Sequence, residues 1–223
     1  MPGAAEKGPI VVAIDGPAGS GKSTLASRLA AELGLPYVNT GLMYRALAHR
    51  ALAQGVDHDD GPALERLLRK MTFEIDRSGR PPALLLDGTR PPDGYAASEV
   101  ENSVSAVARH PEVRRAMVEL QRGLGREGAV MEGRDIGTVV FPEAPVKIYL
   151  DAAPHERAER RTRERKGAAR VAEGLAERDS RDERVNPFVP APNAVRIDTT
   201  TLGADAVLNE AVRIVRERLG GGT

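Results

Sequence analysis

The hydrophobic pattern at the N-terminal end of the chain predicts an alternation of strands and helices. An uninterrupted apolar run at 10–14 is typical of a strand that is covered on both faces. Apolar residues at helical spacing over 23–33 predict a helix that ends at Gly34. A short strand at 36–38 and a helix at 41–52 follow. Because strands and helices alternate, this region is predicted to begin a parallel sheet.

The middle of the chain interrupts this alternation. Apolar positions at 72–76 and 83–86, separated by turn residues, predict a hairpin or a small antiparallel sheet. Two helices are predicted at about 97–109 and 111–123, the second with a proline in its first turn. We therefore interpret 56–122 largely as an inserted subdomain that lies outside the main sheet.

The parallel pattern resumes in the last part of the chain. Short apolar strands are predicted at 129–132, 146–151 and 194–198, and an amphipathic helix is predicted at 204–219. A charged, arginine-rich stretch lies before the last strand. The pattern thus indicates an α/β fold with a parallel sheet core flanked by helices. The predicted division is a core at 9–55, 123–153 and 188–223, an insertion at 56–122, an arginine-rich segment at 154–187 and a disordered terminus at 1–8.

The composition narrows the classes of function. The net charge is +0, whereas proteins whose main task is to hold nucleic acid usually carry a basic excess. Because cysteine is absent, disulfides, thiolate metal sites and cysteine nucleophiles are excluded. No apolar run approaches the ~18 residues of a membrane helix, and the first residues lack the apolar core of a signal peptide. We expect a cytoplasmic protein that binds neither nucleic acid nor membranes.

Residues 16–23 carry the pattern G-x-x-x-x-G-K-[ST] between a predicted buried strand and a predicted helix. The glycines let backbone N–H groups curl around an anion, and the helix start offers further free N–H groups. Lys22 is expected to reach the β- and γ-phosphates of a nucleoside triphosphate, and the Ser23 hydroxyl is expected to bind Mg²⁺. We interpret the triphosphate as ATP. The predicted ATP-binding residues are Gly16, Pro17, Ala18, Gly19, Ser20, Gly21, Lys22, Ser23 and Thr24.

Other motifs favour phosphoryl transfer over nucleotide hydrolysis. No lysine lies in the [NT]-K-x-D element by which GTPases read guanine. A small-molecule kinase needs a second anion site and arginines that close over the transferring group. Thr40 and Arg45 at a predicted helix start are one candidate site, and Arg134 with Asp135 after a predicted strand is another. The arginine-rich stretch 157–184 is a candidate lid.

Several motifs together resemble one known family. The phosphate-binding loop, N-T-G-x-M-Y-R, E-G-R-D-I-G-T-V-V-F-P, V-K-I-Y-L-D-A, E-R-D-x-R-D and I-D-T-T resemble bacterial cytidylate kinases, which are P-loop nucleoside monophosphate kinases. The resemblance runs from about residue 10 to the C-terminus. It implies transfer from ATP to CMP or dCMP with Mg²⁺. It also implies a P-loop core, a monophosphate-binding insertion with a small antiparallel sheet, and a helical lid at 154–187.

The resemblance implies a role for each residue that matches a family motif. The acceptor phosphate would be bound by Thr40, Arg45 and Arg134. The cytosine would be surrounded by Ser105, Arg114 and Asp135, with Arg184 as a further contact. Ribose or phosphates would be met, as the lid closes, by Arg178 and Asp182. Charge in the transition state would be neutralised by Lys22, Arg134, Arg178 and Arg181.

The implied base site has a chemical rationale. Cytosine presents an amino donor beside two acceptors, and a carboxylate with arginine and serine donors complements that edge. Uracil presents an acceptor where Asp135 expects a donor, so we expect UMP to be rejected. The chain departs from the family pattern at Asn39 and Glu132, where aspartate is frequent, and in the spacing near Arg184.

Two other functions remain open from the sequence. One is a P-loop kinase of another small acceptor, such as UMP, pantoate or a coenzyme precursor. The other is a module that binds ATP and transfers nothing. Our main interpretation is a monomeric (d)CMP kinase whose partners are ATP and CMP or dCMP.

Some residues are interpreted structurally. Asp15 is expected to tie down the phosphate-binding loop, and Thr40 also fits a helix N-cap. The arginines of the lid segment without an implied role are expected to form surface pairs at helical spacing with Glu156, Glu159 and Glu164.

Overall fold

The centre of the molecule is a sheet of five parallel strands in the order β2-β5-β1-β6-β7. These strands are β1 (Val11–Asp15), β2 (Tyr37–Asn39), β5 (Ala129–Gly133), β6 (Val146–Asp151) and β7 (Val195–Asp198). β1 lies between β5 and β6, and all of its residues are buried. The predicted parallel sheet is therefore confirmed, and its strands match the predicted ones to within about a residue.

The computed structural model describes residues 9–80, 82–91, 95, 98–164 and 189–220. Within these ranges no helix has the length and apolar character needed to cross a membrane. The predicted disordered terminus and the greater part of the predicted lid lie outside the described residues.

Two apolar cores lie on opposite faces of the sheet. Val12 and Ile14 face a core that α1 (Lys22–Leu33) and α8 (Ala204–Gly220) cover. Ala13, between them in the strand, faces the second core, because successive strand residues point to opposite faces. Burial on both faces explains why the first strand is a continuous apolar run.

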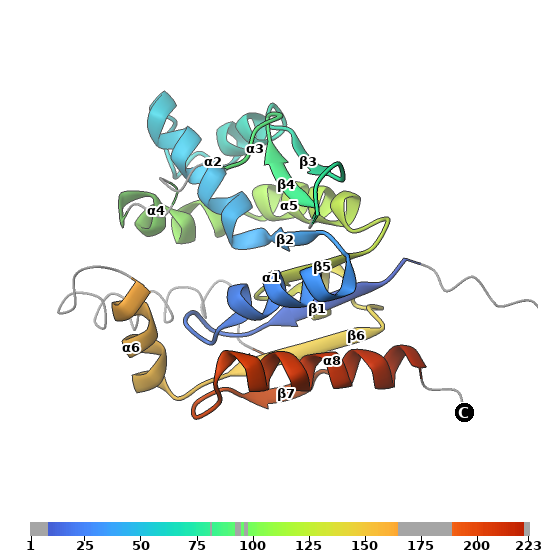
Figure 1. The fold of residues 1–223 in the computed structure, drawn as a ribbon. Helices are drawn as coiled ribbons and strands as arrows, with labels where there is room; N and C mark the ends of the chain where they lie inside the picture. Colours follow the sequence, from blue (N-terminus) through green and yellow to red (C-terminus); the bar gives the residue numbers. More distant parts are fainter. Residues whose placement is uncertain (1–8, 81, 92–94, 96–97, 165–188, 221–223) are drawn as a thin grey trace, which may run out of the picture.

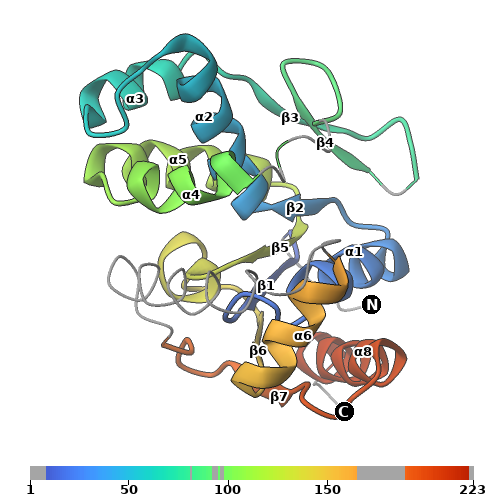
Figure 2. The same cartoon turned by 90° about the vertical axis from the view of Figure 1, so that its left-hand side faces the viewer.

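The elements that follow β2 build the second core. α2 packs against α4, α3 packs against α5, and β3 pairs with β4 in an antiparallel ladder. Both views place them at the β2 end of the sheet, away from β7 and α8 (Figures 1 and 2). The predicted small antiparallel sheet is confirmed. The bounds are α2 (Thr40–Gln54), α3 (Gly61–Leu68), β3 (Phe73–Asp76), β4 (Ala83–Leu86), α4 (Ser98–Ala108) and α5 (Pro111–Leu124).

Local sequence explains where the helices nearest the sheet edge begin and end. The Asn39 side chain accepts a hydrogen bond from the Leu42 N–H at 2.8 Å, so Asn39 is the N-cap of α2. The prediction that Thr40 fits this cap is therefore wrong by one residue. Gly55 ends the helix in the left-handed conformation, with a φ of 63°.

Two further elements border the carboxyl end of the sheet. After β5 the chain forms a π-helical turn, η2 (Ile136–Val140). After β6 it forms α6 (Pro154–Glu164), which is the described part of the predicted lid. Parallel α/β sheets bind ligands at the carboxyl ends of their strands, and both elements lie there.

Candidate active site

The phosphate-binding loop connects the carboxyl end of β1 to the start of α1. A Cβ on Gly16 would lie 2.1 Å from the Leu150 carbonyl oxygen, so only glycine fits this close approach. Gly21 precedes the helix with a φ of 91°, a conformation that other residues rarely adopt. The Lys22 ammonium donates to the Pro17 carbonyl at 2.7 Å and lies folded over the loop. The backbone thus has the curled shape that the motif predicts.

A buried hydroxyl inside this loop has an unused hydrogen-bonding capacity. Ser20 is fully buried, and among the described side chains its Oγ is the buried polar atom without a hydrogen-bond partner. A Cβ on Gly16 would lie 3.1 Å from this Oγ, so the hydroxyl lies within the curl of the loop. An oxygen of a bound phosphate would satisfy such a group.

Asp15 joins the loop to the segment that follows β5. Its carboxylate is buried and accepts hydrogen bonds from the backbone N–H groups of Ile136 and Gly137, each at 2.8 Å. These residues come directly after Arg134 and Asp135. The hydrogen bonds of the Asp15 carboxylate therefore fix the start of η2 beside the loop and do not, as was predicted, tie down the loop itself.

Asp15 gives the stability of the protein a predictable pH dependence. Burial raises the pKa of Asp15 to about 6, and the nearby charge of Asp135 contributes to this rise. The two backbone hydrogen bonds and the charge of Lys22 act in the opposite direction and limit it. The folded state therefore holds the proton more tightly than the unfolded chain. The resulting stabilisation is complete below the unfolded pKa near 3.8 and is lost as the pH rises through about 6.

The variant Asp15→Asn cannot titrate at this position. We expect it to gain about 2 kcal/mol of unfolding free energy relative to wild type between pH 4 and pH 7. At every pH the amide also loses one acceptor, which adds a constant cost. Urea unfolding of both proteins across this range measures the difference. A difference between the two proteins that stays constant with pH would contradict the assignment.

One cleft joins the loop to the predicted acceptor residues. Its volume is about 170 Å³, and α2, α4 and α5 supply one side of it. Every predicted acceptor residue that the structure describes lines this cleft, together with part of the loop. These lining residues are Ala18, Gly19, Lys22, Ser23, Thr40, Arg45, Ser105, Arg114, Arg134 and Asp135.

Arg134 and Asp135 have different partners in the cleft. The Arg134 guanidinium donates to the Gly16 carbonyl at 3.3 Å and so reaches the base of the loop. The Asp135 carboxylate forms an ion pair with Arg114 at 2.6 Å, with 17% and 25% of the two side chains exposed. Ser105 is buried beside them in the lining. The carboxylate, guanidinium and hydroxyl that the family resemblance assigns to the cytosine are thus brought together.

Thr40 begins α2 and lines the cleft together with Glu132. Its hydroxyl is buried and donates to the Glu132 carbonyl at 2.7 Å. Arg45 lies on the same helix and lines the same cleft. The helix start therefore faces the cleft and not the solvent.

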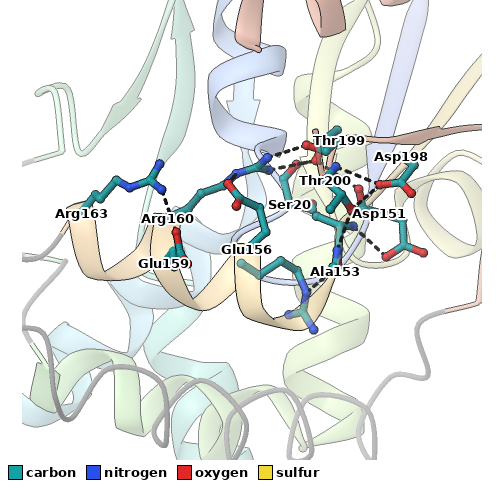
Figure 3. A network of polar contacts seen from close by, with 12 residues as sticks. Ser20, Asp151, Ala153, Glu156, Glu159, Arg160, Arg163, Asp198, Thr199 and Thr200 are labelled. Carbon is teal, nitrogen blue, oxygen red and sulfur yellow. Dashed lines mark hydrogen bonds and ion pairs between the residues drawn. The ribbon is translucent and has the colours of Figure 1, made fainter. Parts of the chain in front are cut away.

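On its other side, the loop borders a second cavity, of about 370 Å³. Arg160 of α6 donates to the Thr199 hydroxyl at 2.9 Å and pairs with Glu156 at 3.0 Å. The Thr199 hydroxyl donates in turn to the Ser20 carbonyl of the loop at 3.1 Å. Figure 3 shows that this network connects α6 with the loop and the turn after β7. Gly19 lines both cavities, so the loop separates them.

The side chains around Ser23 could serve as oxygen ligands for a hard cation such as Mg²⁺ that is bound together with nucleotide phosphates. Ser23 lines the cleft with Asn39 and Glu132, and its side chain lies close to the Tyr37 hydroxyl. These groups offer oxygen atoms, which Mg²⁺ prefers. Within the described ranges, no group of three or more acidic or histidine side chains is placed to hold a metal ion. Mg²⁺ bound to a nucleotide usually keeps several water ligands and is held by phosphates with one or two protein groups.

Comparison with known proteins decides the family. The model of the family described as cytidylate kinase matches residues 12–217. The chain belongs to the cytidylate kinase family. A cytidylate kinase of Geobacillus kaustophilus is 46% identical over 95% of this chain and 98% of its own length. A cytidylate kinase of Solibacter usitatus is 45% identical over 96% of this chain and 95% of its own.

Membership of the cytidylate kinase family confirms the resemblance that the motifs indicated. A cytidylate kinase of Exiguobacterium sp. is 43% identical over 92% of this chain and 96% of its own length, so the likeness extends far beyond the loop. The lid residues implied by the resemblance, Arg178, Arg181, Asp182 and Arg184, lie outside the described residues. Their roles stay predictions.

Arg157 and Arg161 were predicted to form surface pairs, and this prediction is wrong for both of them. Arg157 donates to the Ala18 carbonyl of the loop at 3.1 Å, and Arg161 lines the cleft and pairs with Glu101 of α4 at 3.3 Å. Their spacing of four residues puts both on one face of α6. That spacing could have indicated that the two arginines share a helix face, although it does not indicate which element packs against that face. Arg160 and Arg163 do form the expected pairs with glutamates one turn earlier.

Proposed function

We propose that the chain transfers the γ-phosphoryl group of ATP to CMP or dCMP and releases ADP and CDP or dCDP. One observation carries the proposal: the phosphate-binding loop and the predicted acceptor residues line a single cleft. Phosphoryl transfer needs the two substrates in line, with their phosphates in contact. A shared cleft supplies that arrangement.

We place the ATP phosphates on the loop. Its backbone N–H groups and Lys22 hold them, and the Ser23 hydroxyl holds Mg²⁺. When bound, this ion would neutralise charge on the β- and γ-phosphates. We place the donor nucleoside in the second cavity, where Leu25, Leu202 and Arg160 offer apolar and cationic surface next to the loop.

We place the CMP phosphate between Thr40, Arg45 and Arg134. The three residues line one cleft, and the guanidinium groups of Arg45 and Arg134 can bind phosphate oxygens in a bidentate manner. The cytosine then lies against Asp135, Arg114 and Ser105. The carboxylate accepts from the cytosine amino group, and the Arg114 contact keeps the carboxylate in place.

The reaction needs positioning and charge neutralisation more than acid–base chemistry. An oxygen of the CMP phosphate attacks the γ-phosphorus of ATP, and the bond from that phosphorus to the β-bridging oxygen breaks. The attacking oxygen is already anionic, so no strong base is required. Lys22 and Arg134 lie where they can stabilise the developing charge, and we propose that Arg178 and Arg181 join them.

The subdomain roles and the setting belong to the same proposal. The insertion at 56–122 would bind the monophosphate, and 154–187, beginning with α6, would close over the donor and exclude water. We expect the enzyme to work as a monomer in the cytoplasm.

The proposal is tested with a panel of acceptors in an assay that couples ADP formation to a signal. CMP and dCMP should be phosphorylated, and kcat/KM for UMP should be lower by about 100-fold or more, because a buried acceptor is left unpaired. AMP should be rejected for a different reason, because adenine is larger than cytosine and has no carbonyl oxygen to accept from Arg114 or Ser105. Equal turnover of UMP would favour a kinase of another acceptor. ATP binding without CDP at any enzyme concentration would favour a module that transfers nothing.

A further inference from the structure

A chain of three hydrogen-bonded side chains, outside the proposed substrate contacts, runs beside the cleft. The Asn39 amide nitrogen donates to the Tyr37 hydroxyl oxygen at 3.1 Å. The Tyr37 hydroxyl donates to Glu132 Oε1 at 2.5 Å. The strand register explains the meeting, because Asn39 lies directly opposite Glu132 in the pairing of β2 with β5.

The backbone sets the direction of this chain. Asn39 Oδ1 accepts from the Leu42 N–H as the N-cap of α2, so its Nδ2 must point the other way, toward Tyr37. An amide nitrogen only donates, and the Tyr37 oxygen therefore receives it and turns its own proton to Glu132. Helix capping thus determines which way the hydroxyl proton points.

The end of this chain lies beside the residue assigned to the cation. Glu132 is 4% exposed, so its charge needs a donor close by. The Tyr37 hydroxyl also lies close to the Ser23 side chain, and both Ser23 and Glu132 line the cleft. Burial and the Glu132 charge hold the pKa of the Tyr37 hydroxyl above its usual range, so it stays a donor.

We propose that Tyr37, oriented by Asn39, is a positioning residue that holds the Glu132 carboxylate beside the Ser23 hydroxyl, on the side where the divalent cation of the donor nucleotide binds. This inference rests on the proposed function, in which Ser23 meets the cation. Without the Tyr37 hydroxyl the carboxylate loses its donor and turns away from this position. The cation then loses a neighbouring negative charge, while the phosphate contacts of the loop are unchanged.

The test measures how much Mg²⁺ strengthens ADP binding, with no acceptor present. Isothermal titration gives the ADP affinity of each protein in EDTA and in Mg²⁺. In Tyr37→Phe the strengthening by Mg²⁺ should shrink by about fivefold, while the affinity in EDTA stays that of wild type. Asn39→Ser should act in the same direction. Serine still caps α2, but it is too short to donate to the Tyr37 hydroxyl, and it adds no charge beside the cation.

The matched control is Tyr95→Phe. Tyr95 is buried against His49, with ring centroids 4.9 Å apart, and it does not line the cleft. The Tyr95→Phe variant also removes a tyrosine hydroxyl, and its affinity for ADP in EDTA and in Mg²⁺ should be that of wild type. Circular dichroism and thermal unfolding establish that each variant is folded. Should Tyr37→Phe fail to fold, Asn39→Ser carries the test alone.

Two results would overturn the inference. One is a strengthening by Mg²⁺ that is unchanged in the folded variants. The other is an equal loss of affinity in EDTA and in Mg²⁺, which would mark a purely structural role. Because the titration contains no CMP, it is independent of transfer. Absence of CDP in the acceptor panel would defeat the proposed function, whereas an unchanged Mg²⁺ effect with CDP formed would defeat this inference alone.

Discussion

Arg134→Ala is expected to lower kcat for CMP by about a thousandfold while the protein stays folded. Arg134 lines the cleft and reaches the Gly16 carbonyl at the base of the loop, so it lies between the donor and acceptor sites. Removing it takes away one of the guanidinium groups that stabilise the charge developing on the transferring group. Steady-state kinetics at saturating ATP and CMP measure the loss.

Two controls sharpen this result. Arg69→Ala removes an exposed arginine that pairs with Glu65 at 2.7 Å, outside the cleft, and should leave kcat unchanged. Arg134→Lys keeps the charge but not the planar fork, and should recover only part of the rate. A near-normal kcat in Arg134→Ala would show that the acceptor phosphate binds elsewhere.

Asp135→Asn is expected to lower kcat/KM for CMP by about 100-fold and to reduce the preference for CMP over UMP. The carboxylate is held by Arg114 at 2.6 Å and is mostly buried, so the loss of its charge is poorly compensated by water. The new amide can donate to the uracil oxygen that replaces the cytosine amino group. The ratio of kcat/KM for CMP and UMP is the readout.

A control variant that neutralises a carboxylate outside the cleft shows whether the change in CMP preference comes from the base site or from a general loss of stability. Asp59 forms an exposed ion pair with Arg109, and Asp59→Asn should keep the wild-type ratio. If Asp135→Asn lowers both rates equally and keeps the ratio, Asp135 supports the fold of the cleft and does not read the base.

The parts of the site that are contiguous in sequence were predictable. The phosphate-binding loop is one continuous motif that contains its glycines, Lys22 and Ser23. Its backbone conformation depends on residues close in sequence, and the structure has the expected loop between β1 and α1. Arg134 and Asp135 follow a buried strand, and strand ends in a parallel sheet meet at one edge. Their position therefore follows from the strand that directly precedes them in the sequence.

The parts that depend on packing were not predictable from the residues alone. Ser105 and Arg114 come from α4 and α5, and their place depends on how these helices pack on α2 and α3, so only the family resemblance pointed to them. Arg161 was assigned to the surface because helical spacing gives a face and not its neighbour. Tyr37 was part of a short apolar strand, and its hydrogen bonds appear only when β2 pairs with β5.

The central claim, that donor and acceptor bind in one shared cleft, is tested most directly with a ligand that spans both sites. A compound that joins cytidine and adenosine through five phosphates should bind at least about a hundredfold more tightly than CMP or ADP alone, because its second half binds intramolecularly. It should also be displaced by CMP and by ATP alike. Binding no tighter than ADP, with displacement by ATP but not by CMP, would contradict the account.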